Sequence, residues 1–166
     1  MSDLKGSSLE GGLAPAIKNR VKGKAALVGI GNILRGDDGL GPKLIELIRP
    51  DKINAALFDC GTAPENYILP ILATNADTII FVDAADSGSM PGDIRILGLE
   101  EISTVSFSTH SPSPRLFIDL LKMGKDDLNI FFISIQPKST SLGQSLTKEV
   151  TDSLDFLKNA LVEALS

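Results

Sequence analysis

The sequence predicts a single-domain, three-layer α/β/α sandwich built on a mostly parallel, twisted sheet of about five strands. The chain has 166 residues, 43% apolar and 22% charged, which suits one globular domain with a substantial core. Strand-like apolar runs alternate along it with segments of helical periodicity. Two runs, TIIFV at 78–82 and LNIFFISI at 128–135, are continuously apolar, as strands buried between two helical layers should be.

Net charge and cysteine content narrow the class of partner. A net charge of −5 argues against general affinity for nucleic acid or anionic membranes, because both require a basic surface. The single cysteine, Cys60, cannot form an internal disulfide, and neither a signal-peptide pattern nor an apolar run of membrane-spanning length is visible. We therefore expect a cytoplasmic protein whose partner is a protein or a small molecule.

The chain divides into a short leader and one domain. Residues 1–22 mix Gly, Ser, Lys and Pro without a sustained period, which predicts a loosely ordered N-terminal leader. Residues 23–166 carry the alternating pattern and form the predicted domain.

The first strand and the first helix of that domain flank two acids. Residues 25–30 form an apolar strand that ends in a sharp turn at Gly31. Residues 40–48 follow with apolar side chains at helical spacing. Asp37 and Asp38 therefore lie where a strand ends and a helix begins, the edge at which open α/β sheets usually bind ligands.

The two acids have two interpretations. An aspartate at this position can cap the helix by accepting hydrogen bonds from its first N–H groups, and Asp37 suits that role. One side chain normally serves a cap, so Asp38 is the candidate for chemistry.

The middle of the chain supplies two more acids at strand ends. Residues 53–58 predict a second strand that stops at Asp59, and Pro64 can begin the helix that follows. The strand at 78–82 ends in Asp83. Residues 93–97 then predict a short hairpin-like or edge strand.

The C-terminal half continues the alternation. The loop SFSTHSPSP contains His110, the only histidine, and a helix over 114–122 follows it. The buried strand at 128–135 precedes a final helix over 146–165. The side chains expected to face inward are Leu116, Phe117, Leu120 and Leu121 on the first of these helices and Val150, Leu154, Leu157, Leu161 and Leu165 on the second.

Parallel strands would bring Asp38, Asp59 and Asp83 to one edge of the sheet, and His110 could reach it from its loop. Asp38, Asp83 and His110 would make a partly open three-ligand shell suited to a divalent ion such as zinc, nickel or iron. Each has a structural alternative: Asp83 can bind loop N–H groups, and His110 can face solvent or cap a helix. Asp59 is interpreted as binding the turn at Gly61 and Thr62, and Cys60 as a small buried filler.

Two other site types are disfavoured. The Gly29-Ile30-Gly31 sequence lacks the third glycine of a dinucleotide-binding loop, and adjacent acids would repel a pyrophosphate. Serines flank His110, but no G-x-S-x-G elbow is present, which disfavours a serine hydrolase.

Several blocks in unbroken order carry a family resemblance. They are GIGNILRGDDGLGP, DCGTAPEN, FVDAADSGSMPGDIRIL, STHSPSP, SIQP and a late Gly-x-x-Leu-Thr. Together they resemble the nickel-iron hydrogenase maturation endopeptidases, and within them the hydrogenase 3 maturation protease branch, over about residues 24–160.

The resemblance implies a phosphorylase/hydrolase-like sandwich and a cytoplasmic endopeptidase. Its partner would be a hydrogenase large-subunit precursor, whose C-terminal tail it would remove after nickel insertion. Asp38, Asp83 and His110 match the family's metal-contacting, catalytic positions. The nickel would come with the precursor, and other divalent ions can occupy such a site. The family's DGGT-like turn is DCGT here, so Cys60 replaces a glycine.

Two alternatives stay open at the level of sequence. The chain could be a nickel-sensing chaperone or binding module that does not cut, because neither an independent nucleophile nor a glutamate base is evident. It could also be a metal-dependent hydrolase of a small substrate, which would hold its own metal tightly.

Overall fold

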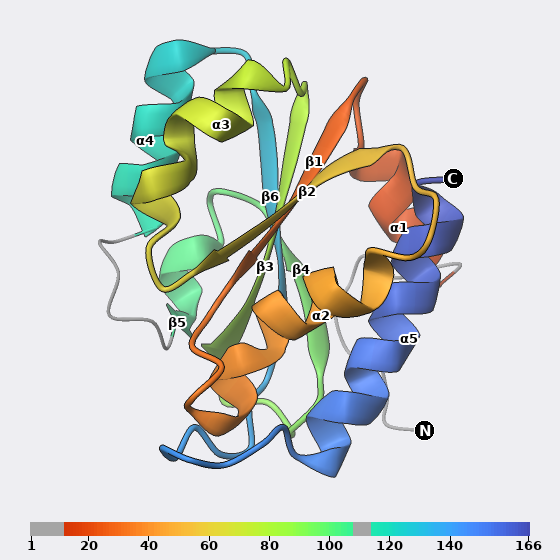
Figure 1. The fold of residues 1–166 in the computed structure, drawn as a ribbon, viewed down its shortest axis with the longest axis vertical. Helices are drawn as coiled ribbons and strands as arrows, with labels where there is room; N and C mark the ends of the chain where they lie inside the picture. Colours follow the sequence, from red (N-terminus) through yellow and green to blue (C-terminus); the bar gives the residue numbers. More distant parts are fainter. Residues whose placement is uncertain (1–11, 108–113) are drawn as a thin grey trace.

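The computed structural model describes residues 12–107 and 114–166, and in this part of the chain one sheet lies between two layers of helices (Figure 1). The strand order along the sheet is β2-β1-β3-β6-β4, and a short sixth strand, β5, pairs with β3. The first four strands of that path are parallel, whereas β4 runs antiparallel at the edge. The bounds are β1 Ala25–Ile30, β2 Ala55–Gly61, β3 Thr78–Asp86, β4 Ile94–Leu97, β5 Ser106–Phe107 and β6 Asn129–Ile135.

Each face of the sheet has its own hydrophobic core. Helices α1, α2 and α5 cover one face, and α3 and α4 cover the other (Figure 1). Three 3-10 segments complete the described elements. The bounds are α1 Leu13–Arg20, α2 Leu40–Ile48, α3 Ile68–Ala73, α4 Pro114–Gly124, α5 Lys148–Ala164, η1 Gly36–Gly39, η2 Pro64–Tyr67 and η3 Ile102–Thr104. The predicted α/β/α architecture is confirmed.

Strand ends differ from the prediction where the pairing between strands continues beyond the apolar residues. The strand at 25–30 and the helix at 40–48 have the predicted bounds. By contrast, β3 continues four residues past Val82, because its pairing with β6 extends to Ala84 and β5 then pairs with its last two residues. The second strand begins at Ala55 and ends at Gly61. Asp59 and Asp83 therefore lie inside strands rather than just beyond them.

The predicted inward face of α4 is partly wrong. Phe117, Ile118 and Leu121 are buried, whereas Leu116 is 50% exposed and Leu120 is 37% exposed. Apolar residues surround most of this helix, so its sequence does not by itself fix which side meets the sheet. On α5 the predicted stripe is confirmed, since all five of its side chains are buried.

The expectation of a loosely ordered leader is wrong for residues 13–20. These residues form α1, which packs on α5 and buries Leu13 and Ile17 in the first core. A helix of eight residues is too short to show a sustained period, and tertiary packing rather than propensity stabilises it. Residues 1–11 lie outside the described residues.

Across residues 12–107 and 114–166, no helix combines the length and the apolar character needed to cross a lipid bilayer.

Candidate active site

The carboxyl ends of the parallel strands lie at the lower end of the molecule in Figure 1. Two loops lie side by side there: the segment between β1 and α2, and the segment between β6 and α5. They place residues that are about a hundred positions apart in sequence against the same sheet edge.

Backbone-to-backbone contacts bring α2 onto this edge. A Cβ atom at Gly41 would lie 2.3 Å from the Ile30 carbonyl oxygen and 2.6 Å from that of Val82, so only glycine allows the helix to approach both strands. A Cβ at Gly31 would lie 1.9 Å from the Asp38 carbonyl oxygen. The glycines that suggested a dinucleotide loop in the sequence therefore serve close packing.

Asp38 and Asp83 reach the same edge from two contacting elements. Asp38 lies in η1, where its carbonyl oxygen accepts a hydrogen bond from the Asn32 N–H at 3.0 Å. Asp83 follows Val82 in β3, and η1 contacts β3. Only 2% of Asp38 and 3% of Asp83 is exposed, so each carboxylate lies in a largely desolvated setting where charge interactions are strong.

His110, the third candidate ligand, lies outside the described residues. Among residues 12–107 and 114–166, no three His, Cys, Asp or Glu side chains are close enough to hold one metal ion. The described part of the site thus supplies carboxylate oxygens, which divalent cations accept as ligands.

Asp37 is not the helix cap that its position predicts, since α2 has no side-chain cap. Its buried carboxylate instead accepts backbone hydrogen bonds from Lys138 at 2.8 Å, Ser139 at 3.1 Å and Thr147 at 2.7 Å. The Thr147 hydroxyl also donates to it, at 2.9 Å. Asp37 therefore ties the loop before α5 to the segment that carries Asp38.

No local sequence signal could reveal this role, because the partners of Asp37 lie 101 to 110 positions away. Gly36, the residue before Asp37, also packs closely against this loop, since a Cβ at Gly36 would lie 2.6 Å from the Ser139 carbonyl oxygen. We call the set of contacts around Asp37 the Asp37 clamp.

Asp59 and Cys60 have the structural roles that we expected. The Asp59 carboxylate accepts the Gly61 N–H at 3.0 Å, which fixes the turn after β2. Cys60 is buried at the irregularity where the β1–β2 register shifts. Burial, with a smaller contribution from the nearby Asp59 charge, raises the pKa of the Cys60 thiol to about 12. At neutral pH the thiol is therefore neutral and a poor nucleophile.

Two residues that carry no local signal in the sequence lie in the same cross-strand row as Asp83. Asp83 pairs with Ser134 of β6, and Ser134 pairs with Arg95 of β4, so all three lie on the same face of the sheet. Ser134 is buried and Arg95 is half-buried. A guanidinium two strands from Asp83 adds a positive charge to this part of the edge.

The end of β3 is held by Gln136, the residue that follows β6. The Gln136 amide donates to the Asp86 carboxylate at 3.1 Å and accepts the Ser87 N–H at 2.9 Å. The Gly88 N–H and the Gln136 amide lower the pKa of Asp86, which keeps it ionised as an acceptor. The strand that carries Asp83 is thus held beyond its last regular pair.

A groove of about 730 Å³ opens beside the candidate site. It begins at Ile33, Gly36 and Gly39 and extends along α2 to Arg49, with the first turns of α5 along part of its wall. Asp59 also lines it. The volume lies within the range of ligand-binding clefts in proteins.

Comparison with known proteins gives one consistent family. The family described as hydrogenase maturation protease matches residues 42–164. The hydrogenase 3 maturation protease of Escherichia coli (strain K12) is 34% identical over 137 residues, covering 81% of this chain and 86% of the relative.

Solved structures agree with the sequence comparison. The crystal structure of the [NiFe] hydrogenase maturation protease HycI from Thermococcus kodakarensis KOD1 superposes with a TM-score of 0.79 at 27% identity, covering 90% of this chain and 97% of that one. The solution structure of the endopeptidase HycI from Escherichia coli gives a TM-score of 0.74 at 32% identity, covering 84% and 90%.

Proposed function

This chain belongs to the hydrogenase maturation protease family, and we propose that it removes the C-terminal extension of a nickel-iron hydrogenase large-subunit precursor in the cytoplasm after nickel has been inserted. The observation that supports the site is the pair of buried carboxylates, Asp38 and Asp83, that two contacting elements bring to one sheet edge. We assign His110 as the third residue of this site.

In the proposed mechanism the nickel is part of the substrate. Asp38, Asp83 and His110 contact the nickel of the precursor, and that contact positions the tail for cleavage. Carboxylate oxygens are ligands that divalent cations accept, so Asp38 and Asp83 favour binding of the nickel-loaded precursor over the nickel-free one. When held by these residues, that nickel would supply a Lewis acid able to polarise the scissile carbonyl and to lower the pKa of the water that hydrolyses the bond.

The experiment is incubation of the metal-free protease with purified precursor, loaded with nickel or free of it, followed by mass spectrometry. We expect the loaded precursor to lose its C-terminal tail and the nickel-free precursor to keep its full mass. Equal shortening of both would contradict nickel sensing. An unchanged mass in both would contradict cleavage and leave a binding role.

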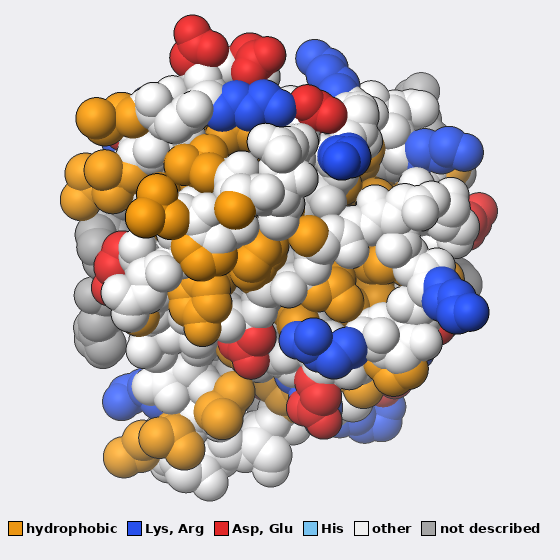
Figure 2. Space-filling view, turned by 45° about the horizontal axis from the view of Figure 1, so that its top comes forward, with side chains coloured by type: hydrophobic (Ala, Val, Ile, Leu, Met, Phe, Trp, Pro, Cys, Tyr) orange, Lys and Arg blue, Asp and Glu red, His pale blue; other side chains and the backbone are white. Residues whose placement is uncertain are grey.

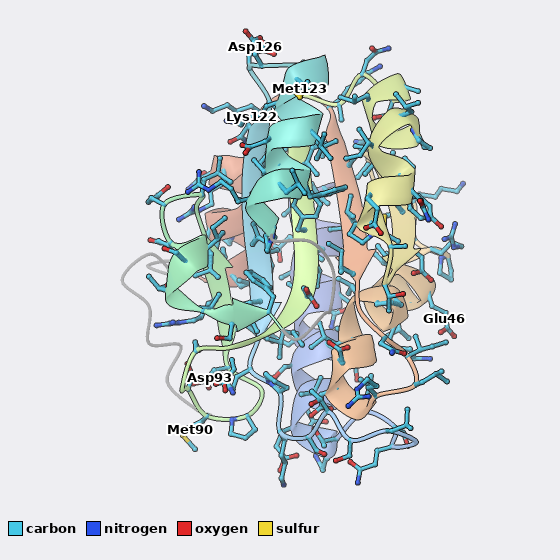
Figure 3. The ribbon with its side chains drawn as sticks, turned by 90° about the vertical axis from the view of Figure 1, so that its left-hand side faces the viewer. Glu46, Met90, Asp93, Lys122, Met123 and Asp126 are labelled. Carbon is cyan, nitrogen blue, oxygen red and sulfur yellow. The ribbon has the colours of Figure 1, made fainter. Side chains whose placement is uncertain are left out.

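Substitutions at the two carboxylates test the site itself. Asp38→Asn and Asp83→Asn keep side-chain size but remove the charge, and we expect each to abolish processing while the thermal unfolding transition stays cooperative. Asp126→Asn is the matched control, because this exposed acid lies at the end of the molecule away from the site edge (Figure 3), and it should still cut. Normal cleavage by either Asp38→Asn or Asp83→Asn would overturn the assignment of that residue.

A further inference from the structure

Three large apolar side chains stand out of the surface beside the candidate site. Ile33 is 70% exposed, Leu34 62% and Leu142 70%, and we call these three residues the apolar rim. Ile33 and Leu34 precede η1, whereas Leu142 belongs to the loop before α5. The two loops meet here, because the Gly143 N–H donates to the Leu34 carbonyl oxygen at 2.8 Å.

The rim is held in place by its own backbone. The Leu34 N–H donates to the Asn32 side chain at 2.9 Å, and the Gly36 N–H donates to the Gln144 carbonyl oxygen at 3.0 Å. The Asp37 clamp joins the same two loops. Apolar side chains on a pre-ordered loop lose little conformational entropy on binding, which is the property of an interface anchor.

The rim is continuous with the site and with the groove. Leu34 and Asp38 belong to one loop, in which the Asp38 N–H donates to the Arg35 carbonyl oxygen at 3.1 Å. Ile33 also lines the groove along α2. The rim therefore lies on the same segment that carries Asp38, next to the groove.

We propose that the apolar rim is the docking surface for the folded body of the hydrogenase large-subunit precursor and lies next to the site that receives its tail. This inference rests on the proposed function. Loop tips that are more than half exposed project outward, so they fit a concave surface on a folded partner better than an extended peptide. The groove along α2 extends the same contact.

A second apolar surface provides the control. Figure 2 shows hydrophobic side chains gathered over α3 and α4, where Leu69, Leu116, Leu120 and Met123 are exposed. Met123 is 83% exposed and lies at the upper end of α4, opposite the sheet edge that carries the site (Figure 3). A substitution there matches the chemistry of a rim substitution without touching the rim.

The test measures cleavage of the nickel-loaded precursor by full-length Leu34→Ser, Leu142→Ser and Met123→Ser variants. We expect each rim variant to raise KM about tenfold, with a much smaller change in kcat, since each removes one anchor of the encounter. Met123→Ser should keep the wild-type KM. Wild-type KM in both rim variants, or the same rise in Met123→Ser, would overturn the proposal.

Binding and oligomeric state separate this inference from the proposed function. Affinity for the same precursor, measured by biolayer interferometry, should fall in the rim variants even where no cleavage is seen; unchanged affinity overturns the rim. A wild-type protein that binds but never shortens the precursor contradicts only the proposed function. A dimer in analytical ultracentrifugation that Leu34→Ser converts to monomers would assign the rim to a second copy and overturn the proposal.

Discussion

One carboxylate organises the sheet edge that bears the candidate site. Asp37 is fully buried and accepts hydrogen bonds from three backbone N–H groups and one hydroxyl, all from the loop before α5. A buried charge is tolerated when it is saturated with donors, and this one is. Its neighbour Asp38 is the residue that we propose for contact with the substrate metal, so in that proposal the two adjacent acids have different roles, one structural and one chemical.

Asp37→Asn should destabilise the protein more than loss of a helix cap would. The asparagine amide would place N–H groups against backbone N–H groups that now donate to Asp37, at a cost of about 2–4 kcal/mol in the free energy of unfolding. Urea denaturation measures it. The exposed Glu46, labelled in Figure 3, provides the control Glu46→Gln, which should cost no more than about 0.5 kcal/mol. A cost for Asp37→Asn below about 1 kcal/mol would restore the cap interpretation.

Cys60 should be chemically silent in the folded protein. Burial raises the pKa of its thiol from 9.0 to about 12, so at pH 8 iodoacetamide should label it only after unfolding in urea, as intact mass would show.

The same pKa shift makes stability depend on pH, because the thiol is deprotonated more readily in the unfolded chain. Stability is therefore complete below pH 9 and falls between pH 9 and about 12. Cys60→Ala should remove this contribution to the loss of stability at alkaline pH. Rapid iodoacetamide labelling of the native protein would contradict the burial of the thiol.

Helix α2 is the element that places the site on the sheet. Its first turn lies against the ends of β1 and β3, so Asp38 at its approach is brought onto the strand that carries Asp83. This arrangement depends on Gly41, where the helix backbone meets the carbonyl groups of Ile30 and Val82. Helix propensity and packing make opposite predictions at this position.

Gly41→Ala should destabilise the protein although alanine is the better helix former. Propensity alone would stabilise the helix by about 1 kcal/mol, whereas the added methyl group would force α2 off the sheet edge. We expect a net loss of about 1–3 kcal/mol in chemical denaturation, together with reduced processing. Lys43→Ala, on the exposed side of the same helix, should change stability little. A gain in stability for Gly41→Ala would contradict the close contact.

The N-terminal and C-terminal helices of the described chain pack against each other. Helix α1 lies on α5, and both contribute to the core on the α2 face of the sheet (Figure 1). Since Thr147, the residue immediately before α5, belongs to the Asp37 clamp, the same helix joins the N-terminal segment to the site edge. Residues near the N-terminus should therefore affect global stability.

Ile17→Ala tests this packing. Ile17 is fully buried, so truncating it should lower the free energy of unfolding by about 2–4 kcal/mol through lost burial and a cavity. Lys18→Ala, on the exposed side of α1, should leave that free energy nearly unchanged. A cost below about 1 kcal/mol for Ile17→Ala would instead support a loosely ordered segment.

The order of strands and helices, the sandwich architecture and the family can be read from the amino-acid sequence, because apolar periodicity and motif spacing are local properties of the chain. The clamp role of Asp37, the orientation of α4 and the packing of α1 emerge only from the folded chain. Each depends on contacts between distant segments, such as the 110 positions that separate Asp37 from Thr147. Local patterns carry no information about such distances, since tertiary packing decides which of several compatible partners a side chain meets.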